Sequence, residues 1–216
     1  MTQILDARLS AGSRRLFAEL AAEVRVRNAK QARPVVCVMD GQASFWDLQK
    51  IGFPEATGIL DIFQVMERLW KAAYAFHPQG SAQAEAFVDQ HLTMLLEGKV
   101  GYEIGVLRRL LNAHRKTLSK SGKDALTEAI RYFNTNRERM HYDEYLKAGY
   151  PIGSGVAEGA CRHVVKDRME RTGMRWEIEG AQPILHLRAI QWNAQWTAFM
   201  KHRIHREQSS LYGLAP

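Results

Sequence analysis

Helical and strand-like hydrophobic patterns alternate in the first third of the chain. From residue 10 to residue 26, apolar side chains recur every three or four positions, which predicts an amphipathic helix. Residues 35–39 form a short continuous apolar run that ends at Asp40, and residues 56–62 form a second run whose end carries Asp61. Such runs are typical of strands buried on both faces. Because a helical stretch separates them, we predict a parallel pair in an α/β sheet.

The pattern is helical from residue 63 onward. Amphipathic segments are predicted at 82–96, 103–118 and 124–136, with breaks at Gly98, at Gly101 and over residues 119–122. A final helix over residues 181–202 is expected to bury one face that includes Trp192 and Trp196.

These patterns predict a strongly helix-dominated α/β fold in three parts. Residues 1–77 form the first half of the core, residues 78–146 form an all-helical insertion, and residues 147–216 contain an acidic helix and the C-terminal helix.

Composition favours one cytoplasmic, soluble domain with an inserted subdomain. The chain has 216 residues, of which 46% are hydrophobic, and we expect neither a signal peptide nor a membrane span. Cys37 and Cys161 lack sequence-near partners, so both are expected to be buried free thiols. The 30 basic and 23 acidic residues give a net charge of +7, which favours a polyanionic partner such as nucleic acid.

One acid stands among many bases in the segment that begins at Tyr150. Proline and two glycines predict a turn, Ser154 can cap the next helix, and Glu158 falls in its first turn, where the helix dipole favours a carboxylate. The cations that follow are Arg162, His163, Lys166, Arg168, Arg171 and Arg175. A carboxylate beside phosphate-attracting side chains suggests metal-assisted chemistry on nucleic acid, with these bases contacting DNA.

Asp40 and Glu158 each have two interpretations. Metal-dependent phosphoryl transfer needs carboxylates from different elements to converge, and a strand-end aspartate with a helix-borne glutamate meets that need. Alternatively, Asp40 is an ordinary turn aspartate before Gly41, and Glu158 is a helix N-terminal acid stabilised by the dipole and by Arg162. The local spacing of residues does not decide between the metal-ligand interpretation and the structural one.

Several ordered motifs resemble bacterial insertion-sequence transposases of the ISKra group. They are Val-Met-Asp40-Gly-Gln-Ala-Ser-Phe-Trp, Ile59-Leu-Asp61-Ile-Phe-Gln64-Val-Met-Glu67-Arg-Leu-Trp, Arg139-Met-His-Tyr, Pro151-Ile-Gly-Ser-Gly-Val-Ala-Glu158, Gly173-Met-Arg-Trp and Gly180-Ala. The resemblance runs from about residue 12 to residue 212. It implies a ribonuclease-H-like core with an Asp-Asp-Glu (DDE) triad that uses Mg²⁺ or Mn²⁺ for DNA transposition.

Carried over to this chain, Asp40 matches the second aspartate of the triad and Glu158 matches the glutamate, so both are the expected metal ligands. Asp61 is an auxiliary acid, and Gln64 stands where relatives commonly have a histidine. The first aspartate has no match, because Asp6 lacks the strand before it and the glycine after it. We therefore expect a truncated, catalytically incomplete carboxyl-terminal part of a transposase. The alternative is a non-catalytic DNA-binding or transposition-modulating helical protein.

The resemblance also implies partners and a location. DNA at the element ends and at the target is the expected partner, together with homo-oligomers or mixed oligomers with an intact transposase. The expected location is the bacterial cytoplasm, in association with the nucleoid.

Overall fold

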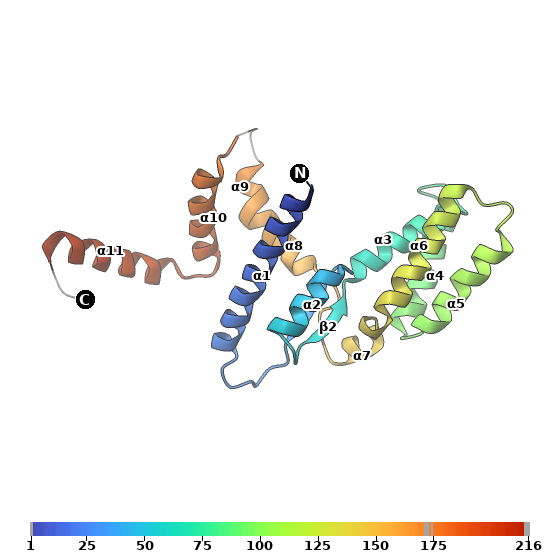
Figure 1. Cartoon of the computed structure of the whole chain (residues 1–216), viewed down its shortest axis with the longest axis horizontal. Coiled ribbons are helices and arrows are strands. Elements are labelled where there is room, and N and C mark those ends of the chain that lie inside the picture. The colour runs from blue at the N-terminus through green and yellow to red at the C-terminus, as the bar shows by residue number, and fades with distance from the viewer. Residues whose placement is uncertain (1, 171–172, 174, 214–216) are drawn as a thin grey trace. The chain divides into compact units, whose positions relative to one another are not determined.

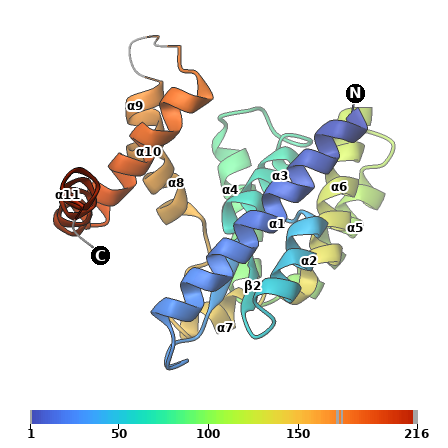
Figure 2. The same ribbon diagram turned by 60° about the vertical axis from the view of Figure 1, so that its left-hand side comes forward.

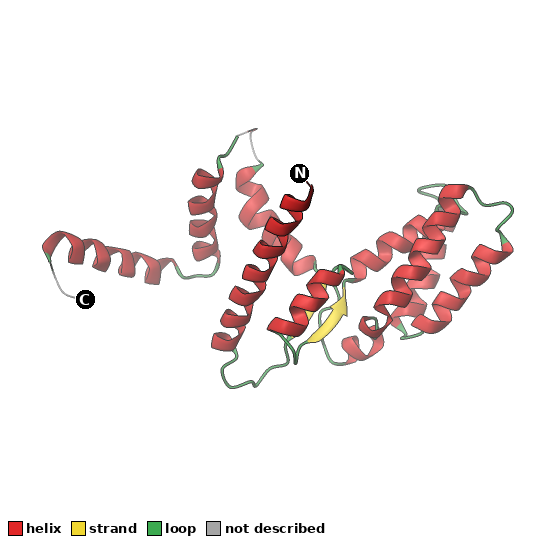
Figure 3. Ribbon diagram, in the orientation of Figure 1, coloured by secondary structure: helices red, strands yellow, loops and turns green. Residues whose placement is uncertain are grey.

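The computed structural model describes the backbone of residues 2–170, 173 and 175–213, and their side chains apart from 2–11 and 178. The chain divides into two compact units, Met1–Ser154 (unit 1) and Gly155–Pro216 (unit 2). Helices make up most of both units, and the strands that the structure describes belong to unit 1 (Figure 3). The predicted parts 1–77 and 78–146 thus share one unit.

Two parallel strands, β1 (Val36–Met39) and β2 (Thr57–Leu60), form the sheet, with Met39 opposite Leu60. Helix α2 (Ala43–Gly52) connects them. This confirms the predicted parallel pair. Each strand is shorter than its apolar run, and Ile62 at the end of the second run already belongs to the next helix. Met39 and Leu60 are paired, so Asp40 and Asp61, which follow them, lie at the same edge of the sheet.

Helix α1 (Thr2–Arg27) runs along α2 (Figures 1 and 2). The ring of Phe17 on α1 lies with its centroid 6.1 Å from that of Phe45 and 6.4 Å from that of Phe53. Leu16 and Leu20 remain exposed on the same helix. The predicted helix is confirmed, and within the described side chains only part of its apolar stripe is covered.

The rest of unit 1 is helical, as predicted. Its elements are α3 (Ile62–Ala73), α4 (Ala82–Leu96), α5 (Val100–Ala113), α6 (Lys120–Asn136), the short 3-10 helix η1 (Arg137–Arg139) and α7 (Tyr142–Lys147). Ser81 and Ser119 cap α4 and α6 through their hydroxyl oxygens. The expected break at Gly101 is wrong, because Gly98 already makes the turn with a φ of +78° and α5 begins at Val100. The break expected over residues 119–122 lies earlier in the chain, because α5 ends at Ala113 and α6 begins at Lys120.

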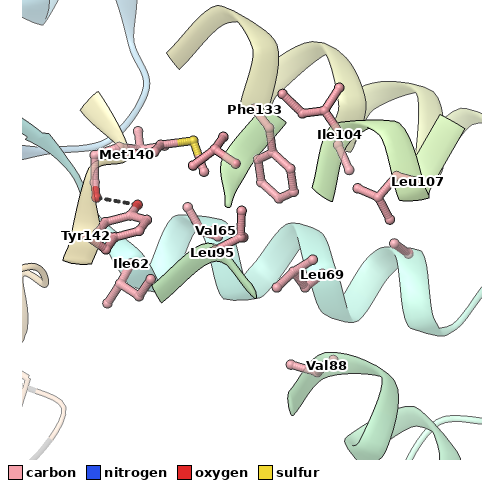
Figure 4. Packing of buried hydrophobic residues seen from close by; sticks show 14 of the residues in the cluster. Ile62, Val65, Leu69, Val88, Leu95, Ile104, Leu107, Phe133, Met140 and Tyr142 are labelled. Carbon is pink, nitrogen blue, oxygen red and sulfur yellow. Dashed lines mark hydrogen bonds between the residues drawn. The ribbon is translucent and has the colours of Figure 1, made fainter. Parts of the chain in front are cut away.

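The core of unit 1 lies between α3 and the helices α4 to α6. Phe133, Val65 and Leu69 are fully buried there, with Ile104 and Leu107 alongside (Figure 4). Truncating a buried ring such as Phe133 to alanine costs about 3–5 kcal/mol. This helical core is continuous with the sheet.

A buried tyrosine ties the sheet to the helices. Tyr142 has 0% exposure, and its hydroxyl donates a hydrogen bond to the carbonyl oxygen of Leu60 at 2.8 Å. Burial raises the pKa of this hydroxyl far above its usual value. Tyr142, the first residue of α7, therefore fixes the end of β2 through this hydrogen bond.

Unit 2 consists of α8 (Gly155–Cys161), the π-helix η2 (Arg162–Lys166), α9 (Asp167–Met169), α10 (Ile178–Trp192) and α11 (Trp196–Tyr212). The single helix expected over 181–202 is wrong. Asn193 ends α10 and Ala194 has a φ of +55°, which an α-helix cannot accommodate. Trp192 and Trp196 are 61% and 44% exposed, so the expected burial of these two side chains is wrong.

Within the described part of the chain, no helix combines the length and the apolar character required for crossing a bilayer.

Candidate functional site

Asp40 lies directly after β1 with an exposed side chain. Its Oδ1 accepts a hydrogen bond from the amide of Gln42 at 3.1 Å, and its carbonyl oxygen accepts from the same amide at 2.6 Å. This is the local turn expected of an aspartate that precedes Gly41. The carboxylate is nevertheless open to solvent, so the turn does not prevent it from meeting a ligand.

Asp61 is placed very differently, with only 5% exposure. Its Oδ1 accepts from the amide of Phe63 at 3.1 Å, which caps α3, and from the amide of Ser154 at 3.3 Å. The amide of Ile62 also donates to the carbonyl oxygen of Ile152 at 2.9 Å. Asp61 therefore anchors the segment that precedes Gly155, the first residue of α8.

Tyr132 of α6 reaches the strand ends from the helical part of unit 1. Its hydroxyl oxygen accepts a hydrogen bond from the amide of Gly41 at 3.1 Å. A Cβ on Gly41 would lie 2.5 Å from the Tyr132 ring, so the turn after Asp40 needs a glycine here. The turn is thus packed directly against the ring.

Arg68 of α3 stacks on the same ring, with its Cζ 3.6 Å from the ring centroid of Tyr132. Its Nη1 donates to the carbonyl oxygen of Gln64 at 3.0 Å and to the Gln64 Oε1 at 3.3 Å. The predicted auxiliary residue Gln64 therefore orients Arg68. The Nε of Arg68 is buried and has no hydrogen-bond partner within the described residues.

Electrostatics connect Tyr132 to both strand-end acids. Burial raises the pKa of its hydroxyl to about 12, and the Arg68 guanidinium opposes the rise. The carboxylates of Asp40, Asp61 and Glu67 add to it. At neutral pH the hydroxyl keeps its proton.

Unit 2 carries the predicted acid and bases. Glu158 lies in the first turn of α8, as predicted, and is exposed. It lines an open hollow whose walls are formed by Gly155, Glu158, Gly159, Cys161, Arg162, Lys166, Asp167 and Glu170. Cys161 is exposed, so its expected burial is wrong, whereas Cys37 is half-buried and burial raises the pKa of its thiol.

The cations predicted to contact DNA surround a π-helical turn. Arg162, His163, Lys166, Arg168 and Arg175 are exposed, and Arg171 lies outside the described residues. The Nε of Arg188 donates to the carbonyl oxygen of Val164 at 2.9 Å, and its Nη2 donates to that of His163. Arg188 thereby binds carbonyls of the π-helix, and such turns are common at functional sites.

The resemblance implies a divalent metal pair, which needs several free carboxylate oxygens. Unit 1 offers the exposed Asp40, whereas the Oδ1 of Asp61 already accepts two amide hydrogens. Within the described residues, no three His, Cys, Asp or Glu side chains gather closely enough to hold a metal ion. This donor set does not by itself fit two metal ions. Glu158 belongs to the other unit, so the separation of Asp40 and Glu158 stays a prediction.

Comparisons with protein-family models, with curated proteins and with solved structures found no match to this chain. The site therefore rests on its own geometry. Sequence reasoning missed Tyr132, which stands within an amphipathic helix without a local motif. It gave Arg68 no role, although Arg68 lies inside the motif that begins at Ile59. The one indirect signal was Gly41, whose missing side chain makes room for the ring.

Proposed function

We propose that the chain is a DDE-type DNA-transposition protein that binds DNA and contributes two acids, Asp40 and Glu158, to phosphoryl transfer. The observation that carries the proposal is the exposed carboxylate of Asp40 at the carboxyl end of a parallel strand. Ligand sites of open α/β sheets gather at this edge. The parallel pair with its intervening helix is the part of a ribonuclease-H-like core that this proposal assigns to unit 1.

Unit 2 supports the DNA-binding half of the proposal. Glu158 lies within one helical turn of Arg162, and exposed cations continue through Arg168. Cations so arranged neutralise phosphates and release counterions on binding. On this proposal the partners are DNA at element ends and targets, and oligomers with itself or with an intact transposase, in the bacterial cytoplasm.

Mg²⁺ or Mn²⁺, when bound, would neutralise charge at the scissile phosphate. Asp40 and Glu158 are the residues that would hold it. Because each carboxylate both positions and neutralises a cation, two acids should support little cleavage or strand joining by the chain alone.

The test measures duplex binding first, and then cleavage and joining with each metal, for the wild type and for Asp40→Asn and Glu158→Gln. The matched control is Asp47→Asn, which neutralises a different exposed acid that lies on α2. We expect the wild type and all three variants to bind duplex in a salt-sensitive way. Weak cleavage should be lost in Asp40→Asn and Glu158→Gln and kept in Asp47→Asn. A wild-type chain that does not bind duplex even at low salt contradicts the proposal.

A second candidate function is non-catalytic DNA binding that modulates transposition. The exposed bases from Arg162 to Arg168 favour it, since they need no metal to hold phosphates. Wild-type binding with no cleavage under either metal, unchanged in the Asp40→Asn and Glu158→Gln variants, would select this alternative.

A further inference from the structure

Two hydrogen-bond donors beside the strand ends lack acceptors in the described chain. The hydroxyl oxygen of Tyr132 is used as an acceptor by the amide of Gly41, which leaves its own O–H to donate elsewhere. No acceptor for that O–H is found among the described residues. The buried Nε of Arg68 is likewise without a partner there.

The two donors belong to one assembly. Arg68 lies flat on the Tyr132 ring, with its Cζ 3.6 Å from the centroid, and Gln64 fixes the guanidinium through Nη1. Gly41 holds the hydroxyl from the other side. Both donors are therefore preorganised, and little side-chain entropy is left for a ligand to remove.

The Nε of Arg68 is buried without an acceptor, which is costly, whereas the half-buried Tyr132 hydroxyl can reach a ligand. A negatively charged oxygen is the stronger acceptor here, since one donor belongs to a cationic guanidinium. Glu67 does not accept from the Nε, because its Oε1 pairs with Lys71 at 2.7 Å and its Oε2 lies 3.8 Å from the Nη1 of Arg68.

We propose that Tyr132 and Arg68 form a phosphodiester-binding pair, in which the Tyr132 O–H donates to a non-bridging phosphate oxygen of DNA held beside Asp40. This inference rests on the proposed function and names two residues of the helical part as its DNA contacts. The ring of Tyr132 keeps the turn after Asp40 in place, while the hydroxyl proton contacts the substrate.

The test compares Tyr132→Phe with the wild type in binding to a short random-sequence DNA duplex. Phenylalanine keeps the ring under Arg68 and removes only the hydroxyl. The matched control is Tyr102→Phe, because Tyr102 on α5 also carries a stacked arginine, Arg109, 5.6 Å from its centroid, and is 59% exposed. We expect Tyr132→Phe to weaken binding about tenfold, the size of a hydrogen bond to a charged group, and Tyr102→Phe to have no effect.

A second measurement observes the intact Tyr132 side chain in the wild-type protein. Wild-type protein labelled with 3-fluorotyrosine gives a fluorine resonance for Tyr132, which is identified by its absence in Tyr132→Phe. We expect the duplex to shift this resonance and to leave that of Tyr102 in place.

An unchanged affinity in a folded Tyr132→Phe protein, or an unmoved Tyr132 resonance in duplex-saturated wild type, overturns the inference and leaves the proposed function standing. A wild-type chain that does not bind duplex overturns both.

Discussion

The Nδ1 of His91 on α4 lies 2.8 Å from the Oε1 of Glu103 on α5, and both side chains are almost completely buried. The Oε2 of Glu103 has no hydrogen-bond partner within the described residues. The ring of Phe87 covers the histidine, with centroids 4.0 Å apart. The two helices are thus joined by one polar contact inside an apolar core.

Removing one partner of this pair should strongly lower the free energy of unfolding. Glu103→Ala leaves His91 buried without its acceptor, so we expect the free energy of unfolding to fall by about 3–5 kcal/mol. Urea unfolding measures the change. The matched control is Glu97→Ala, which removes an exposed pair with Lys99 at 2.6 Å and should leave the free energy of unfolding nearly unchanged. Equal destabilisation in the two variants would show that burial does not decide the strength of the His91–Glu103 pair.

Asp61 should act as a structural anchor. Asp61→Ala removes the acceptor of the Phe63 and Ser154 amides, so unit 1 should be destabilised by about 1–2 kcal/mol, as when a helix cap is removed. Amide hydrogen exchange at Ser154 should become faster.

Asp61→Asn is the corresponding control, because it keeps an acceptor oxygen in the same place. It should retain slow exchange at Ser154. If Asp61→Asn abolished duplex cleavage while keeping that slow exchange, Asp61 would be a site acid as well as an anchor.

Alkaline pH should report the environment of Tyr132. Its folded-state pKa of about 12 lies above the value near 10 of an unfolded tyrosine, so the folded protein holds this proton more tightly. The resulting stabilisation is complete below pH ~10 and is lost as the pH rises through about 12.

The unfolding free energy of the wild type should therefore fall more steeply than that of Tyr132→Phe over this interval. The two slopes of unfolding free energy against pH should differ by an amount that corresponds to less than about one proton. Parallel curves would show that Tyr132 ionises normally in the folded protein.

DNA affinity should depend on salt through the cations of unit 2. Replacing Arg162, Lys166 and Arg168 with alanine should flatten the slope of log affinity against log salt, by about 0.9 for each phosphate that is no longer neutralised. Filter binding or fluorescence anisotropy over a range of salt concentrations measures this slope.

A triple variant on α11 removes the same charge from a different helix. It replaces the exposed Lys201, Arg203 and Arg206 with alanine, and we expect a smaller change in slope. If only the α11 variant flattened the slope, the DNA-binding surface would lie on that helix.

The sequence by itself determined the local elements of this protein. The continuous apolar runs before Asp40 and Asp61 form two parallel strands, and the predicted helix at 82–96 has the bounds of α4. Glu158 lies in a first helical turn as its position after Ser154 predicted. Short-range hydrophobic period and turn chemistry control such features, and both are visible in a single chain segment.

Only the tertiary structure decided what the polar side chains do. The Gly41–Tyr132 and Asp61–Ser154 hydrogen bonds join residues 91 and 93 positions apart, and even the His91–Glu103 pair bridges two helices. Asp40 and Asp61 look equivalent in the sequence, since each ends an apolar strand. Packing leaves the first exposed and gives the second two amide donors, because hydrogen bonding and desolvation depend on neighbours that the fold brings from distant parts of the chain.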